Sequence, residues 1–149
     1  MGAGQKLAEV LLAFDFGTRR IGVAVGQTTT RSANVAGTLA ANGGKPDWQA
    51  VLACIREWAP TRLLVGLPYN MDGSETSTTA ACRAFGEELS RRCALPVEFV
   101  DERLTSNAAY DELRDARRTG IRARRIRRED IDANAARLIL ETWLQARGR

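Results

Sequence analysis

Three acidic residues occupy positions where a carboxylate needs a partner. Asp15 follows a continuous apolar run, 10–14, which is typical of a strand covered on both faces. Glu102 follows a second apolar strand, 97–100. A buried carboxylate is unfavourable unless it is paired or bound to a metal ion. Because open α/β sheets bind ligands at the carboxyl ends of parallel strands, these acids indicate a candidate site.

Asp132 is the third acid, and helical spacing separates it from Asp130. On a helix over 131–147, position 132 lies on the apolar stripe formed by Ala135, Ala136, Ile139 and Trp143. Position 130 lies on a polar face. We therefore expect Asp132 to point at the sheet, and Asp130 to point to solvent or to cap the helix.

The chemistry that fits these acids depends on metal ions. Each acid taken alone is more often a turn former or a helix cap. Histidine is absent from the chain, which removes His-based triads and imidazole metal sites. Ligand sets of oxygen alone favour Mg²⁺ or Mn²⁺, and two such ions can activate water and stabilise the leaving oxygen of a phosphodiester. Asp101 and Glu102 face opposite sides of one strand, and because both sides are apolar, spacing does not choose between them.

The elements that must position these acids alternate in an α/β pattern. We expect strands at 10–14, 21–25, 33–39, 63–65 and 97–100, and helices at 46–59, 75–93, from 105 or 106 onward, and at 131–147. Three strands in succession, followed by strands alternating with helices, predict a mixed five-stranded sheet flanked by helices. It is antiparallel on one side and parallel on the other. The 149 residues suit a single domain, residues 1–149.

Charge favours a polyanionic partner. The net charge is +4, and eight arginines fall within the fifteen residues 114–128. Such a segment would bind phosphates without regard to base sequence, and without interleaved aromatics it does not indicate base stacking. A solvated loop is the alternative. We favour nucleic acid because the segment leads directly into the helix that carries Asp132.

Other features point to the cytoplasm. No apolar run approaches the ~20 residues that a membrane span needs, so we expect no membrane partner, and residues 1–6 lack the zones of a signal peptide. Cys54, Cys82 and Cys93 form no CxxC pair. Each falls in an apolar helical stretch, where we expect a small hydrophobe in a reducing compartment.

Four motifs stand out along the chain: the segments 14–25, 66–74 and 101–106, and Asp132 followed by Ala135-Ala136 and Ile139-Leu140. Together they resemble the YqgF (RuvX) family of Holliday-junction resolvases and pre-16S rRNA nucleases. The resemblance covers essentially the whole chain in the right order. Three positions depart from the family pattern: Arg19 stands where lysine is frequent, Gln27 near a position that is often acidic, and Tyr69 where leucine is usual.

The resemblance implies a ribonuclease-H-like fold with Asp15, Glu102 and Asp132 as catalytic metal ligands, and it favours Glu102 over Asp101. It also implies a hydrolase acting on ester bonds, with Mg²⁺ or Mn²⁺, in two ions, as cofactor. Two activities are linked to the family. We favour maturation of the 5′ end of the 16S rRNA precursor, with association with a ribosomal precursor. Resolution of branched DNA is the alternative, and the sequence leaves the oligomeric state open.

Further residues are candidates for contacting nucleic acid. Arg19 and Arg20 lie at a hairpin tip, Asn70 lies on the loop of segment 66–74, and Arg103 follows Glu102. The arginine-rich segment adds Arg122, Arg124 and Arg125. The alternatives are an exposed turn position for Arg19 and Arg20, a turn-forming role for Asn70, and a structural salt bridge for Arg103.

Two rival functions are weaker. An ATP-binding protein of the actin, sugar-kinase and heat-shock chaperone superfamily shares the strand and Asp-x-Gly-Thr hairpin, but that fold needs two such domains. No GxxxxGK[ST] or GxGxxG motif offers another nucleotide site. A non-catalytic nucleic-acid-binding module would place three carboxylates against a polyanion, which repels them unless metal ions intervene.

Overall fold

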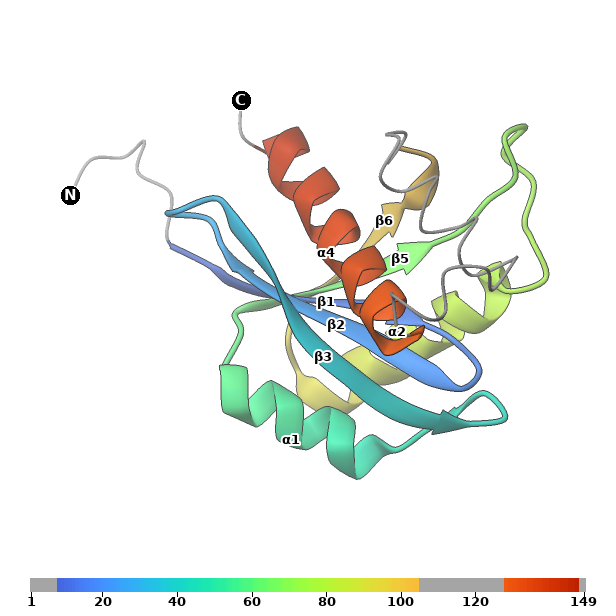
Figure 1. The fold of residues 1–149 in the computed structure, drawn as a ribbon, viewed down its shortest axis with the longest axis horizontal. Coiled ribbons are helices and arrows are strands. Elements are labelled where there is room, and N and C mark those ends of the chain that lie inside the picture. The colour runs from blue at the N-terminus through green and yellow to red at the C-terminus, as the bar shows by residue number, and fades with distance from the viewer. Residues whose placement is uncertain (1–7, 105–127, 148–149) are drawn as a thin grey trace.

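A computed structural model describes residues 8–104 and 128–147. Among these residues, six strands form a sheet in the order β4-β3-β2-β1-β5-β6 (Figure 1). The strands are β1 (Val10–Phe16), β2 (Arg20–Gln27), β3 (Ser32–Asn42), β4 (Lys45–Pro46), β5 (Arg62–Leu67) and β6 (Val97–Asp101). β1 to β4 pair antiparallel, whereas β5 and β6 run parallel to β1. The predicted mixed sheet is confirmed.

The short strand β4 is an addition to the five predicted strands. Gly43 and Gly44 both have positive φ angles, 57° and 83°, which glycine adopts without steric penalty. The chain reverses there, and Lys45 pairs with Asn42. A two-residue strand has too little pattern to be read from sequence.

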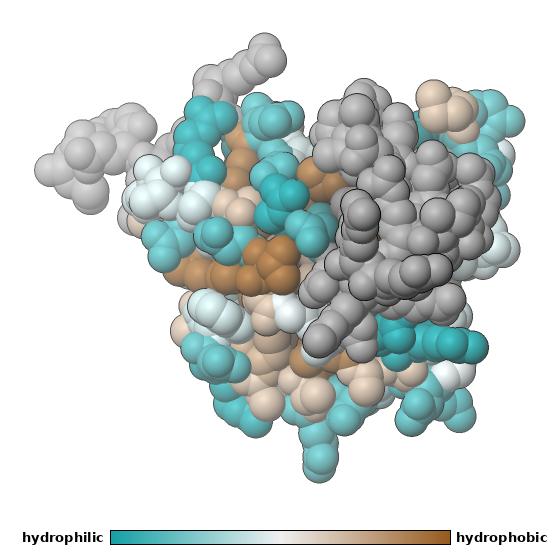
Figure 2. Space-filling view, viewed as in Figure 1, coloured by the Kyte–Doolittle hydropathy of each residue, from teal (hydrophilic) through white to brown (hydrophobic). Residues whose placement is uncertain are grey.

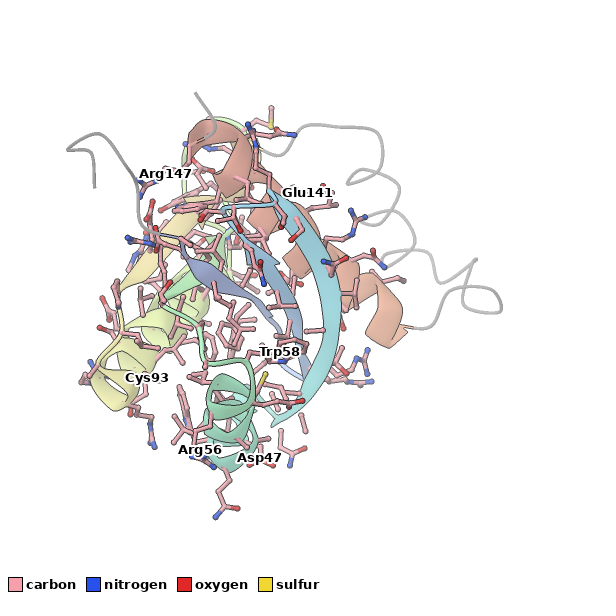
Figure 3. The ribbon with its side chains drawn as sticks, turned by 90° about the vertical axis from the view of Figure 1, so that its left-hand side faces the viewer. Asp47, Arg56, Trp58, Cys93, Glu141 and Arg147 are labelled. Atoms are coloured by element: carbon pink, nitrogen blue, oxygen red, sulfur yellow. The ribbon has the colours of Figure 1, made fainter. Side chains whose placement is uncertain are left out.

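Helices cover both faces of the sheet. They are α1 (Trp48–Trp58), α2 (Thr79–Cys93) and α4 (Arg128–Arg147), with a 3-10 turn, η1 (Glu102–Leu104), after β6. α1 and α2 lie on one face and α4 crosses the other, as the edge view of the sheet shows (Figures 1 and 3). The helix predicted from residue 105 or 106 falls outside the described residues.

Alternation along β1 separates two cores. Leu12 and Phe14 pack beneath α1 and α2, whereas Leu11 and Ala13 pack beneath α4. All four are fully buried, as expected for a central strand covered on both faces. Odd-numbered residues of β1 therefore face α4, and even-numbered residues face α1 and α2.

Helix α2 begins four residues later than the predicted start at residue 75. Glu75 instead forms an isolated β-bridge with Tyr69. Thr79 is fully buried, and its hydroxyl donates to the carbonyl of Pro68 and accepts from the amide of Thr76. These side-chain hydrogen bonds satisfy the Pro68 carbonyl and the Thr76 amide, and they compete with the backbone hydrogen bonds that would extend α2 by one turn toward residue 75.

Helix α1 has a defined N-cap, which gives a first prediction. The Asp47 carboxylate accepts a hydrogen bond from the Ala50 amide at 3.2 Å, and Figure 3 shows Asp47 at the start of the helix. Asp47→Ala should lower the free energy of unfolding by about 1 kcal/mol, because a first-turn amide loses its partner. Urea denaturation measures this. Asp47→Ser keeps a capping oxygen and should stay close to wild type, and equal loss in both variants would contradict the capping role.

The described surface in the view of Figure 2 mixes hydrophilic and apolar areas, with one continuous apolar strip. None of the helices within residues 8–104 and 128–147 combines the length and apolar character that a bilayer crossing demands.

Candidate active site

Asp15 lies on the face of the sheet that α4 covers. It has the same parity as Leu11 and Ala13, which pack beneath α4. The strand does not end at Asp15 as predicted. Asp15 pairs with Gly22 on β2, and the ladder continues through Phe16. The carboxylate therefore projects from within the ladder and is half-buried, which fixes its direction more firmly than a loop position would.

Gly22 allows the start of α4 to approach Asp15. A Cβ added at Gly22 would overlap the carbonyl oxygen of Asp132. Since φ of Gly22 is not positive, this glycine serves close approach of two backbones and not a special conformation. Asp132 thus lies above the residue that pairs directly with Asp15. Its neighbours Ala135 and Ala136 are buried, as the helical spacing predicts.

Glu102 reaches the same face from the other side of Asp15. Val100 packs beneath α4, and Glu102 lies two residues further along. A Cβ added at Gly66 would stand 2.7 Å from Oε2 of Glu102. Because Phe14 pairs with Val65, Gly66 is the next residue on the strand beside Asp15. Two glycines on the neighbouring strands therefore leave room on either side of Asp15, one for Glu102 and one for the backbone of Asp132.

Asp101 is turned away from this group. Its parity places it with Phe99, which packs on the α1–α2 side. The Arg103 guanidinium donates to the Asp101 carboxylate from Nε, at 3.1 Å from both oxygens, and from Nη2, at 2.7 Å from Oδ2. These bonds lower the pKa of Asp101 below its usual value. The structure thus supplies a physical reason to choose Glu102, which spacing alone did not.

Asp15 and Glu102 share a neighbourhood with Cys82 on α2. Burial, followed by the charges of Asp15 and then Glu102, raises the pKa of the Cys82 thiol to about 12. The thiol lies 3.9 Å from the carbonyl oxygen of Phe16. The sequence predicts only a packing role for Cys82, because its proximity to the acids depends on how α2 meets the sheet.

The described residues do not form a complete metal site as they stand. Within them, no three Asp, Glu or Cys side chains are placed to hold one metal ion. Asp132 instead accepts a hydrogen bond from Arg20 at 3.0 Å. The donor chemistry nevertheless suits a hard cation, because the acids gathered on this face offer carboxylate oxygens. The three-carboxylate metal set stays a prediction.

Of the residues predicted to contact nucleic acid, the structure places Arg19, Arg20, Asn70 and Arg103. Arg19 is exposed beside the start of β2. The Asn70 amide donates to the Ser74 hydroxyl at 2.9 Å, so Asn70 shapes its loop. The rest of the set, Arg122, Arg124 and Arg125, falls outside the described residues.

Arg103 links the loop of segment 66–74 to the end of β6. Besides its bonds to Asp101, its guanidinium lies over the Tyr69 ring at 5.3 Å from the centroid. The Tyr69 hydroxyl accepts a hydrogen bond from Arg83 at 3.1 Å, and Arg83 pairs with Glu75 at 3.0 Å. Arg83 and Glu75 were not predicted from the sequence, because their pairs form across a loop whose path no spacing rule predicts. This network braces the loop next to the acids.

The cysteine environments give a second prediction. Burial and then Glu57 raise the pKa of Cys54 to about 11, and the thiol of Cys82 is shifted further. Burial also raises the pKa of Cys93, but nearby Arg92 opposes it. Cys93 is the last residue of α2 (Figure 3) and is half-buried. At mildly alkaline pH, iodoacetamide should therefore modify Cys93 first and Cys82 last, because the thiolate is the reactive form. Peptide mass spectrometry measures the order, and modification of Cys82 before Cys93 would contradict it.

Comparison with known families identifies the fold and the lineage. The sequence model of the RuvX family, described as Holliday junction resolvase, matches residues 9–146. The chain belongs to the RuvX family. A relative of this RuvX chain from Coxiella burnetii (strain Dugway 5J108-111) bears the provisional name pre-16S rRNA nuclease. It is 48% identical over 136 residues, which cover 91% of this chain and 92% of the relative.

A second relative carries the same provisional name. It comes from Pseudomonas paraeruginosa and is 48% identical over 143 residues, which cover 95% of this RuvX chain and 96% of the relative. The predicted family membership is therefore confirmed by both kinds of comparison.

Solved structures show the same fold at low sequence identity. The RuvC protein of T. thermophilus in complex with a Holliday junction substrate matches with a TM-score of 0.56 and 13% identity, covering 92% of the RuvX chain and 95% of its own. The yeast mitochondrial Holliday junction resolvase matches with a TM-score of 0.54 and 11% identity, covering 93% and 78%. At such identities the likeness shows the fold alone, and it confirms the predicted ribonuclease-H-like class.

Proposed function

We propose that this RuvX-family chain is a nuclease that hydrolyses nucleic-acid phosphodiesters, with Asp15, Glu102 and Asp132 as its catalytic acids. One observation carries the proposal. Asp15 and Glu102 project onto the same face of the sheet, Glu102 lies against Gly66 on the strand beside Asp15, and the backbone of Asp132 lies over Gly22. The names of the relatives support the reaction class.

Asp15, Glu102 and Asp132 would hold the divalent metal ion or ions, Mg²⁺ or Mn²⁺. When bound, such ions activate water and stabilise the leaving oxygen of the phosphodiester. The chain contains no histidine, so its own contribution is to orient carboxylates and to neutralise phosphates. We assign that second role to Arg19 and Arg20 on the β1–β2 hairpin, which lies beside Asp15.

We infer that the physiological substrate is the 16S rRNA precursor, cut during maturation of its 5′ end. The relatives named pre-16S rRNA nuclease are 48% identical to this chain, and their names support this choice. This substrate would place the protein in the cytoplasm, in association with a ribosomal precursor. Residues 1–149 would act as one nuclease domain.

Branched DNA is the second candidate substrate. The family description favours it, and so does the fold shared with a RuvC protein seen on a Holliday junction. Symmetric cleavage of a four-way junction would need two copies of the site, arranged by a dimer. Trimming of one RNA end would need a single copy.

Cleavage of both substrates side by side tests the proposal. A 16S precursor with its 5′ leader and a synthetic four-way junction are incubated with the protein and Mn²⁺ or Mg²⁺. We expect metal-dependent cleavage of the leader, and cleavage of the junction only at higher enzyme concentration. Preferential cleavage of the junction would reverse the choice of substrate, and inactivity on both would reject the nuclease function.

A further inference from the structure

Arg20 and Asp132 form an ion pair that links β2 to the start of α4. The Arg20 Nε donates to Oδ2 of Asp132 at 3.0 Å, across 112 residues of sequence. The exposed fractions of the two side chains are 26% and 20%. Partial burial reduces screening by solvent and salt, so this pair interacts more strongly than a surface pair.

The backbone near this pair has little freedom to move. The carbonyl of Asp132 lies against Gly22, where even a methyl group would not fit, and α4 is buried against the sheet through Ala136, Ile139 and Leu140. Asp132 can therefore leave Arg20 only by turning its side chain. In this arrangement the guanidinium of Arg20 holds one of the carboxylate oxygens that the proposed function assigns to a metal ion.

We propose that Arg20 is a positioning residue that acts as a stand-in cation for Asp132 before nucleic acid binds. When a phosphodiester enters, the guanidinium transfers from the carboxylate to a phosphate oxygen, for which its donor geometry is equally suited. The Oδ2 atom of Asp132 thereby loses the guanidinium as a competitor for a metal ion. Nucleic acid and metal ion then bind cooperatively, because each removes a competitor of the other. This inference rests on the proposed nuclease function.

The first test measures Mn²⁺ affinity by calorimetry on the full chain without nucleic acid. Arg20→Gln should bind Mn²⁺ about five- to tenfold more tightly than wild type, since a partly buried ion pair no longer competes. Arg19→Gln removes the same charge from the adjacent, exposed position and should change Mn²⁺ affinity by less than about twofold. Arg20→Lys keeps the charge without the guanidinium geometry and should fall between them.

A double-mutant cycle supplies the second test. Affinity for a fluorescein-labelled single-stranded RNA is measured by anisotropy in EDTA. Asp132→Asn should tighten RNA binding in the wild-type background, because Arg20 is released to the phosphates, and this gain should vanish in the Arg20→Gln background. Glu102→Gln removes an equal charge, and any gain that it produces should be the same with or without Arg20.

The outcomes separate this inference from the nuclease function. Equal Mn²⁺ affinity in Arg20→Gln, Arg19→Gln and wild type would overturn the role of Arg20 while leaving the metal site intact. A gain from Asp132→Asn that persists without Arg20 would overturn it as well. Failure of every protein to bind Mn²⁺ would reject both the inference and the metal-dependent function.

Discussion

Replacing Asp15 by asparagine should lower kcat for metal-dependent cleavage by at least about 10³-fold, because the several kcal/mol that a bound metal contributes to transition-state stabilisation are lost. The amide has the same shape but no charge, so the β1–β2 ladder should remain. RNA affinity in EDTA should stay constant or rise, because one carboxylate facing a polyanion is removed. Single-turnover cleavage and anisotropy measure the two effects separately.

A neighbouring pair of acids provides the matched control. Glu102→Gln should be as inactive as Asp15→Asn, whereas Asp101→Asn should reduce kcat by less than about tenfold, since Asp101 lies on the other face and bonds to Arg103. Equal loss of activity in both variants would show that the face assignment is wrong. Unimpaired cleavage by Asp15→Asn would reject the site itself.

Alanine at Gly22 should destabilise the fold by about 1–3 kcal/mol and inactivate the enzyme together with it. The added methyl group would overlap the carbonyl oxygen and backbone of Asp132, and a backbone held in a buried helix cannot yield by changing rotamer. The start of α4 must then shift away from β2, and Asp132 moves with it. Thermal unfolding gives the loss of stability, and single-turnover cleavage gives the loss of activity.

Gly66→Ala should separate loss of activity from loss of stability, in contrast to Gly22→Ala. The atoms nearest to a methyl group added at Gly66 would belong to two side chains, Glu102 and Ile139, and not to the backbone, and side chains adjust more readily than a backbone does. We expect unfolding within about 1 kcal/mol of wild type but a loss of cleavage of about 10²-fold, because the Glu102 carboxylate is displaced. If Gly66→Ala cleaved as wild type, Glu102 would not act from this position. If Gly22→Ala were as stable as wild type, the close approach of α4 would be refuted.

Local patterns predicted much of this arrangement from the sequence. The apolar run before Asp15 identified the central strand, and spacing on α4 placed Asp132 on the buried side. Both predictions use residues that lie close together in the sequence, within one strand or one helix. The late start of α2 escaped prediction, because its cause is a buried hydroxyl at Thr79 that bonds to a distant carbonyl.

Contacts between remote segments could not be predicted in the same way. The choice between Asp101 and Glu102 depends on which face of β6 lies beneath α4, and both faces are apolar. The pairing of Arg20 with Asp132 joins residues 112 positions apart. No periodicity carries that information, and only the packing of α4 over Gly22 brings the two together.

Diffraction from crystals soaked in Mn²⁺ would decide whether these acids bind a metal ion, because the anomalous signal locates the ion without reference to activity. We expect a peak bonded to carboxylate oxygens of both Asp15 and Glu102, lost in Asp15→Asn crystals. Asp132 should approach that peak when nucleic acid is present. A peak at Asp101, or one that persists without the Asp15 carboxylate, would contradict the proposed active site.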